Sequence, residues 1–337
     1  MKDSLRGVPV IVGVVALFLV VQVGALALLD PFQSAGLQST ENPQNPLNSV
    51  FYVAFLLVAT AGILLVIKYD QQWILRAFIL FTSGFIATYV FGVVLPTVEV
   101  AGVNAAAYVP AAALVVALYV YPEWWVIDSA GAILGMGAAA LFGISFGVLP
   151  ALVLLTALAV YDAISVYGTE HMLTLAEGVM ELRLPIVLVV PATRGYSFLE
   201  ESAGSDADDE PESESEAEPE PEAVEDRDSE ERQLDGVDEE ERGAYFIGLG
   251  DAVMPTIMVA SAAFFLDTPT VFGVELAALT AMVGTLAGLL VLMRMVFAGR
   301  AHAGLPLLNG GAIAGYLVGA LAAGIPLVEA LGLAPYV

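Results

Sequence analysis

The chain has 337 residues, enough for two soluble domains, but 58% of them are hydrophobic and the mean hydropathy is +0.81. Ordinary globular chains contain about 45–50% apolar residues, so this composition argues strongly against a soluble protein. The net charge of -26 is concentrated, because residues 200–242 hold 22 acidic and 3 basic residues and leave 15 acidic and 8 basic elsewhere. The absence of cysteine excludes disulfide bonds, thiolate metal sites and a thiol nucleophile.

Apolar segments of roughly membrane-spanning length follow one another along the chain, separated by polar or turn-rich breaks. A bilayer core of about 30 Å requires about 20 apolar residues in a helix. We therefore predict an all-α, polytopic membrane protein with nine transmembrane helices. The predicted spans are residues 8–29, 50–67, 73–95, 105–121, 125–144, 148–167, 245–266, 273–296 and 303–325.

The basic residues predict the orientation of these spans, because short cytoplasmic loops collect Lys and Arg. With the N-terminus inside, all eleven fall on one side, whereas the opposite loops 30–49, 96–104 and 267–272 contain none. We therefore predict a multi-pass protein of the cell membrane with its N-terminus in the cytoplasm and its C-terminus outside. The basic residues are Lys2, Arg6, Lys68, Arg76, Arg183, Arg194, Arg227, Arg232, Arg242, Arg294 and Arg300.

Four segments make up the predicted domain organisation. Residues 1–167 contain transmembrane helices 1 to 6, and residues 243–337 contain helices 7 to 9. Residues 168–192 are predicted to form an interfacial amphipathic helix and a short extended segment that includes the β-rich run Ile186–Val190. Residues 193–242 alternate acidic residues with Ser and Pro, a pattern that predicts a disordered cytoplasmic loop.

Two aspartates lie within predicted spans, where an ionisable side chain is costly and marks a functional site by default. Asp162 is expected about 8 Å, and Asp251 about 9 Å, from the inner ends of consecutive antiparallel helices. Two carboxyl groups at one depth can share a proton, so that one acts as a base on water while the other donates to the scissile bond. Asp128 lies near the inner start of its span and is interpreted as an interfacial or helix-terminal charge.

Small and aromatic residues flank the two acids. Gly248 and Gly250 lack side chains, so a substrate backbone can approach Asp251. Tyr161 precedes the first aspartate and can donate a hydrogen bond or pack beside the pair. A single Gly-x-Gly-Asp in a membrane helix is also explained by close helix packing, so the catalytic interpretation depends on the second aspartate at matching depth.

These residues resemble a known family. Tyr161-Asp162 and Gly248-Leu249-Gly250-Asp251, on either side of a long loop, resemble the YD and GxGD motifs of the presenilin and signal peptide peptidase intramembrane aspartyl proteases. The resemblance covers nearly the whole chain, includes the stretch His171–Val179, and is of the archaeal presenilin type. It implies an aspartic endopeptidase that cuts transmembrane helices near their cytoplasmic end, with Asp162 and Asp251 as the catalytic pair. We expect no metal or cofactor, because no His, Asp and Glu grouping has convincing metal-ligand spacing.

The family also carries a Pro-Ala-Leu motif at the inner start of its last span, and this motif is degraded here. Gly304-Leu305-Pro306 keeps the small residue, the Leu and a following Pro, but Ala303 replaces the first proline; a shifted match starts at Pro306-Leu307. The resemblance implies that this segment aligns the catalytic helices, whereas the residues alone fit an ordinary helix start. It also implies that Ile186–Val190 receives a substrate as an added strand.

Other functions remain open from the residues alone. A proton- or cation-coupled transporter can use the same carboxylates as a relay, although no inverted repeat is obvious. Prepilin peptidases are a further alternative, because they also use a Gly-x-Gly-Asp motif. Their motif is similar to Gly-x-Gly-Asp-x-Lys, whereas Val253 occupies the lysine position here. A catalytically silent scaffold is a further alternative. The expected partners are transmembrane-helix peptides and the lipid bilayer, with no nucleic acid; homo-oligomerisation is left open.

Overall fold

A computed structural model describes residues 3–69, 71–168, 187–191, 196–197, 244–297 and 303–336. Within these ranges the chain is mostly helical, as expected, but it also contains three two-stranded antiparallel sheets. Most of the segment predicted as an amphipathic helix and most of the acidic loop, residues 193–242, lie outside the described residues.

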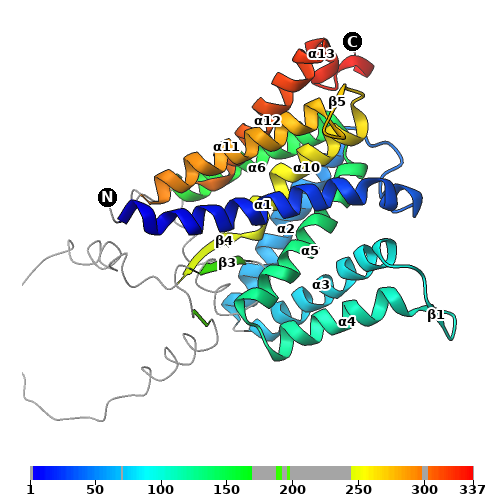
Figure 1. The fold of residues 1–337 in the computed structure, drawn as a ribbon, viewed down its shortest axis with the longest axis vertical. Coiled ribbons are helices and arrows are strands. Elements are labelled where there is room, and N and C mark those ends of the chain that lie inside the picture. The colour runs from blue at the N-terminus through cyan, green and yellow to red at the C-terminus, as the bar shows by residue number, and fades with distance from the viewer. Residues whose placement is uncertain are drawn as a thin grey trace, which may run out of the picture.

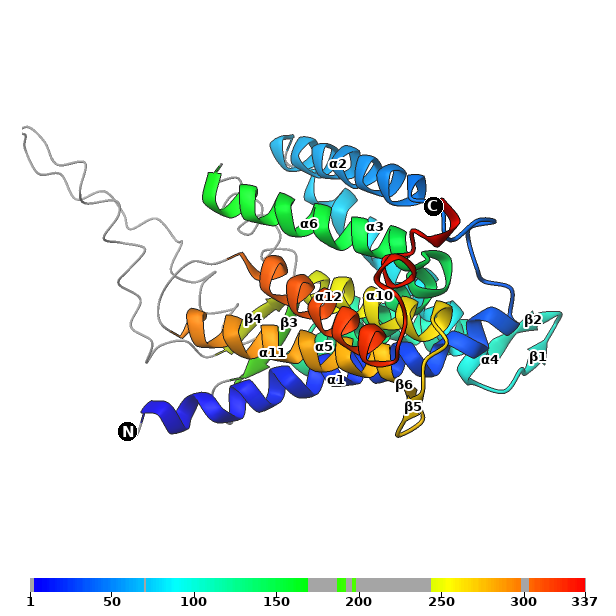
Figure 2. The same cartoon turned by 90° about the horizontal axis from the view of Figure 1, so that it is seen from above.

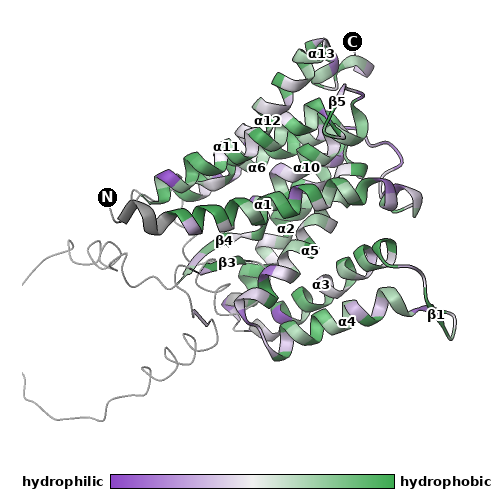
Figure 3. Ribbon diagram, in the orientation of Figure 1, coloured by the Kyte–Doolittle hydropathy of each residue, from purple (hydrophilic) through white to green (hydrophobic). Residues whose placement is uncertain are grey.

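Long apolar helices make up most of the described chain, and Figure 3 shows hydrophobic residues along nearly all of them. Seven of these helices are long and apolar enough to cross a membrane. Two others, with 16 and 17 residues, are apolar but shorter. The protein is therefore a multi-pass membrane protein. The helices are α1 (Asp3–Ser34), α2 (Leu47–Lys68), α3 (Gln72–Val94), α4 (Ala105–Val120), α5 (Trp124–Ser145), α6 (Val148–Gly168), α10 (Leu249–Phe265), α11 (Leu276–Val296) and α12 (Gly304–Ala322), followed by the short α13 (Leu327–Ala330) and η1 (Ala334–Tyr336).

The seventh predicted span begins later than the sequence pattern indicates. Residues Ala244–Gly248 form strand β4, and α10 begins only at Leu249. A short apolar run does not distinguish a strand from a buried helix, and here β4 finds a partner in β3 (Val187–Pro191). Asp251 therefore lies in the first turn of α10 and not about 9 Å inside a helix, as the span 245–266 implied.

Two β-hairpins with the same type of turn each connect two helices. Both lie at the end of the molecule opposite to the β3–β4 pair. Their turn residues, Ala101-Gly102 and Phe272-Gly273, all have positive φ, as in a type I′ turn. The second hairpin takes up the start of the predicted span 273–296, so α11 begins at Leu276. Both hairpins follow the pattern Leu-x-Thr-x-x-Val-x-Gly-Val-x-x-Ala-Ala. Their strands are β1 (Glu99–Val100), β2 (Val103–Asn104), β5 (Thr270–Val271) and β6 (Val274–Glu275).

Helix α10 occupies the centre of the fold, where it contacts α1, α5, α6, α11 and α12. The antiparallel helices α3 and α4 pack against α5 on one side, and α2 lies on the outside against α6, as Figures 1 and 2 show. The N-terminus, the β3–β4 pair and the start of α12 lie at one end of the molecule (Figure 2). The two hairpins and the C-terminus lie toward the other end. Residues 187–191 and 244–251 therefore lie at the end opposite the hairpins, which is also the end where α6 finishes.

Helices α11 and α12 are in backbone contact along a stripe of glycines. A Cβ added to Gly311 would overlap the carbonyl oxygen of Gly284, and a Cβ added to Gly288 would overlap that of Leu307. Close approach through small residues is typical of helix pairs in membranes. This contact holds α12 in place along its first turns.

We expect Gly311→Ala to lower the free energy of unfolding by about 1–3 kcal/mol, because the new methyl group would overlap backbone atoms of α11. Thermal denaturation in detergent micelles measures the effect. The matched control is Gly310→Ala on the same helix, where no atom lies within 4 Å of the added Cβ and stability should not fall. Equal melting temperatures for the two variants would contradict the close α11–α12 contact.

Candidate active site

Asp162 lies on α6 and faces the first turn of α12. Its side chain is only 5% exposed, and one carboxylate oxygen accepts a hydrogen bond from the backbone N–H of Leu305 at 3.0 Å. The backbone N–H of Gly304 is directed at the same carboxylate. The first N–H groups of a helix lack intrahelical acceptors, so Asp162 satisfies them and the helix dipole favours its negative charge.

Asp251 reaches the same turn of α12 from the start of α10, and its side chain is partly buried. A Cβ placed on Gly304 would lie 3.5 Å and 3.6 Å from the two carboxylate oxygens of Asp251. The carboxylates of Asp162 and Asp251 are also close enough to interact electrostatically. The first turn of α12 therefore lies against both acids.

The three residues before Asp251 have different surroundings. Gly248 is the N-cap residue of α10, and a Cβ added to it would lie 3.5 Å from an Asp251 oxygen. Gly250 is exposed, and a Cβ added to it would meet no atom within 4 Å. Leu249 points toward α5, where its Cδ1 lies 3.2 Å from the position of a Cβ on Gly135. The open side of the helix start is therefore at Gly250, next to the acid.

The remaining predicted site residues lie at the margins of this arrangement. Tyr161 is 38% exposed, so Asp162 turns inward while its neighbour turns outward. Pro306 is the third residue of α12, where the missing N–H costs no intrahelical hydrogen bond. Leu307 packs partly buried against the apolar cluster formed with α1, β3 and α11. Gly304 and Leu305 make the contacts with the acids described above, and the shifted match Pro306-Leu307 follows them on the helix.

Asp128 has a different environment from the one that its sequence position indicated. The N-cap of α5 is Glu123, whose side chain accepts a hydrogen bond from the N–H of Trp124, so the helix-terminal interpretation of Asp128 is wrong. The Asp128 side chain is 9% exposed and accepts a hydrogen bond of 2.7 Å from the N–H of Val189 in β3. The partners are 61 positions apart, and no spacing in the sequence pairs them.

The sequence did not indicate the environment of Asn309. Its side chain is fully buried, and its Nδ2 donates a hydrogen bond of 3.0 Å to the carbonyl oxygen of Leu155 on α6. Asn309 lies one turn after Leu305, and Leu155 lies about two turns before Asp162. The hydrogen bonds of Asp162 and Asn309 thus cross the contact between α6 and α12 and fix its register.

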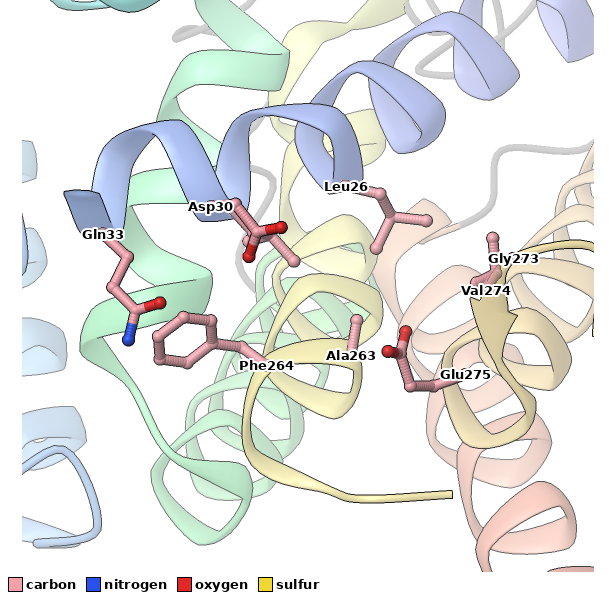
Figure 4. Close-up of a pocket in the computed structure, with 9 residues that line it drawn as sticks. Leu26, Asp30, Gln33, Ala263, Phe264, Gly273, Val274 and Glu275 are labelled. Atoms are coloured by element: carbon pink, nitrogen blue, oxygen red, sulfur yellow. The ribbon is translucent and has the colours of Figure 1, made fainter. Parts of the chain in front are cut away.

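A cavity of about 350 Å³ lies at the other end of α10, as Figure 4 shows. Asp30 faces it from α1, and Glu275 faces it from the end of β6, just before α11. None of the predicted site residues lines this cavity. In the described part of the chain, His, Asp and Glu side chains form no group of three suited to a metal ion.

The sequence model of one family, described as "Signal-peptide peptidase, presenilin aspartyl protease", matches residues 15–325. The chain belongs to this family. The predicted family is therefore confirmed, and the protein is an intramembrane aspartyl protease, a peptide-bond hydrolase. Family membership supports the protease among the functions left open by the residues.

Two solved structures of a presenilin family intramembrane aspartate protease are similar to this protease. The structure in space group C222 has 33% sequence identity and a TM-score of 0.63, and the match covers 93% of this chain and 99% of the other. The structure in space group P2 has 34% identity and a TM-score of 0.59, covering 92% and 97%. The comparison with curated proteins finds no match.

Substitution of Gly304 tests the contact between α12 and Asp251. Gly304→Ala should keep most of the activity, because its Cβ would make ordinary contacts of 3.4–3.6 Å with Leu292 and Asp251. Gly304→Leu should displace Asp251 and lower kcat/KM by about 100-fold, since a shift of about 1 Å at a reacting group can cost that much. Initial rates on a single-span substrate, normalised to folded protein, measure both. Equal activity of the Leu and Ala variants would contradict the contact.

Proposed function

We propose that Asp162 and Asp251 are the catalytic dyad of this protease and that its substrates are transmembrane-helix peptides. The observation that carries the proposal is the first turn of α12, which binds Asp162 through the N–H of Leu305 and lies against Asp251 at Gly304. Two acids brought together in this way share one proton, as hydrolysis without a covalent intermediate requires.

The surroundings of the two carboxyl groups assign their roles. Asp162 accepts backbone N–H groups at a helix N-terminus and is therefore the charged member. Asp251 lies close enough to this charged carboxylate to interact with it, and a second negative charge there is unfavourable, so Asp251 carries the shared proton. A water molecule between them gives a proton to Asp162 as its oxygen attacks the scissile carbonyl carbon, and Asp251 protonates the carbonyl oxygen. Collapse of the resulting diol returns a proton to Asp251, transfers another from Asp162 to the amide nitrogen and breaks the C–N bond.

A substrate helix hides its peptide bonds in intramolecular hydrogen bonds and must be extended before hydrolysis. The edge of β3 is occupied at its central residue, because the N–H of Val189 donates to Asp128. We place an added substrate strand along β4 (Ala244–Gly248), because β4 continues directly into the start of α10, in place of the run Ile186–Val190 proposed from the resemblance. β4 leads directly into Gly248 and Asp251, so a strand beside it passes the acid.

The proposal includes nine membrane spans with the N-terminus and the acidic loop in the cytoplasm. The ends of α2 and α11 carry Lys68 and Arg294, and Arg76 lies near the start of α3. All three helix ends lie at the N-terminal end of the molecule (Figure 2), which is the pattern expected for the cytoplasmic side. The two shorter helices, α4 and α10, are each joined to a β-hairpin at the other side.

Single cysteines test this orientation, since the natural chain contains none. A membrane-impermeant thiol reagent should label Phe272→Cys, at a 97% exposed hairpin position, only from the outside of right-side-out vesicles. The same reagent should label Tyr69→Cys, in the turn between α2 and α3, only in inverted vesicles. Labelling of both positions from the same side would contradict the proposed topology.

Asp162→Asn and Asp251→Asn should each abolish cleavage of a single-span reporter, because an amide cannot share or relay the proton. Rates in proteoliposomes, with thermal denaturation as a check on folding, measure the effect. The matched control is Asp267→Asn, an exposed acid just after the far end of α10, which should retain activity. Cleavage by either dyad variant at a rate near that of the natural chain would reject the proposal.

A further inference from the structure

Asp128 is a buried acid that the proposed chemistry does not use. It lies on α5 within the membrane-spanning part of the chain, where a carboxyl group is costly unless it is hydrogen-bonded. Its side chain accepts a hydrogen bond from the backbone N–H of Val189 at 2.7 Å, a short distance typical of a charge-assisted hydrogen bond. Among the described residues, this carboxyl group is hydrogen-bonded to β3, so its burial is tied to the position of that strand.

The face of α5 that carries Asp128 also contacts strand β3 further along the helix. Gly131, one turn further on, leaves room for Leu188 of β3, whose Cδ2 lies 2.8 Å from the position of an added Cβ. Gly135, one more turn along, leaves the same room for Leu249. The residues recur at helical spacing, so one face of α5 contacts β3 and the segment that leads into Asp251.

The strand pair transmits this position to the active site. Val189 lies opposite Phe246, and the register continues to Val187 opposite Gly248, the N-cap of α10. In an antiparallel pair the N–H groups alternate between the partner strand and the other edge. The N–H of Val189 is used at that other edge, so Asp128 holds β3 without competing with β4. A slip of β3 along α5 would move β4 and the start of α10 with it.

We infer that Asp128 is a positioning residue for the protease, which fixes the strand pair against α5 and thereby sets which substrate bond reaches the two acids. Gly131 serves the same contact by admitting Leu188. This inference rests on the proposed function of Asp162 and Asp251. It assigns Asp128 the role of a hydrogen-bond acceptor, so the negative charge itself is not required.

The test measures kcat and the positions of cleavage in a single-span helical substrate by mass spectrometry. Asp128→Leu keeps the branched shape of the side chain but removes the acceptor, and we expect kcat to fall about tenfold or more and cleavage to spread to neighbouring bonds. Asp128→Asn keeps an acceptor for the N–H of Val189 and should restore both the rate and the single cleavage pattern. Amide hydrogen exchange at Val189 should be faster in the Leu variant than in the Asn variant.

Gly131→Ala disturbs the same contact between α5 and β3 without changing Asp128. This variant therefore provides a second test if Asp128→Leu does not fold. It should broaden the cleavage pattern, whereas Gly137→Ala, whose Cβ would lie 2.6 Å from Val90 on α3, should not. A single unchanged cleavage pattern in Asp128→Leu and Gly131→Ala, or loss of activity in Asp128→Asn equal to that in Asp128→Leu at equal folded protein, would overturn the inference. Asp162→Asn serves as the control. If this variant still loses activity while the Asp128 and Gly131 variants give the contradicting results, the role inferred for Asp128 is wrong but the proposed dyad still holds.

Discussion

The first turn of α12 contacts two acids that lie on the neighbouring helices α6 and α10. A carboxylate removed from water needs hydrogen-bond donors, and a buried apolar helix supplies them only at its N-terminus, where N–H groups lack intrahelical partners. Leu305 donates to Asp162, and Gly304 has no side chain to separate Asp251 from that turn. The start of α12 thus packs against both helices that carry the acids, α6 and α10, which also contact each other directly.

The remaining helices serve this contact by fixing the three elements that meet there. The glycine stripe between α11 and α12 holds α12 from one side, and Asn309 ties it to α6 through the carbonyl of Leu155. On the opposite side, α5 holds the strand pair through Asp128 and Gly131 and so fixes the start of α10. Small residues allow close backbone approach, and buried polar side chains set the register, which is a common division of roles in membrane helix packing.

The sequence predicted the family and the helical membrane architecture, because long apolar runs and the paired Asp motifs are local signals. It placed the boundaries of α2, α5 and α6 within a few residues. It did not predict that residues 244–248 form a strand, since an apolar run followed by glycines fits either conformation until a partner strand is known. The hydrogen bonds of Asp128 and Asn309 join positions 61 and 154 residues apart, and no local pattern encodes such pairs.

The most direct measurement is a cross-link between the two acid positions. The natural chain has no cysteine, so Asp162→Cys with Asp251→Cys can be treated with a short thiol cross-linker and then cut at a protease site inserted between residues 200 and 242. We expect the two fragments to stay joined, as they should for the neighbouring pair Leu155→Cys with Asn309→Cys. Fragments that separate for the acid pair, while the neighbouring pair remains joined, would contradict it.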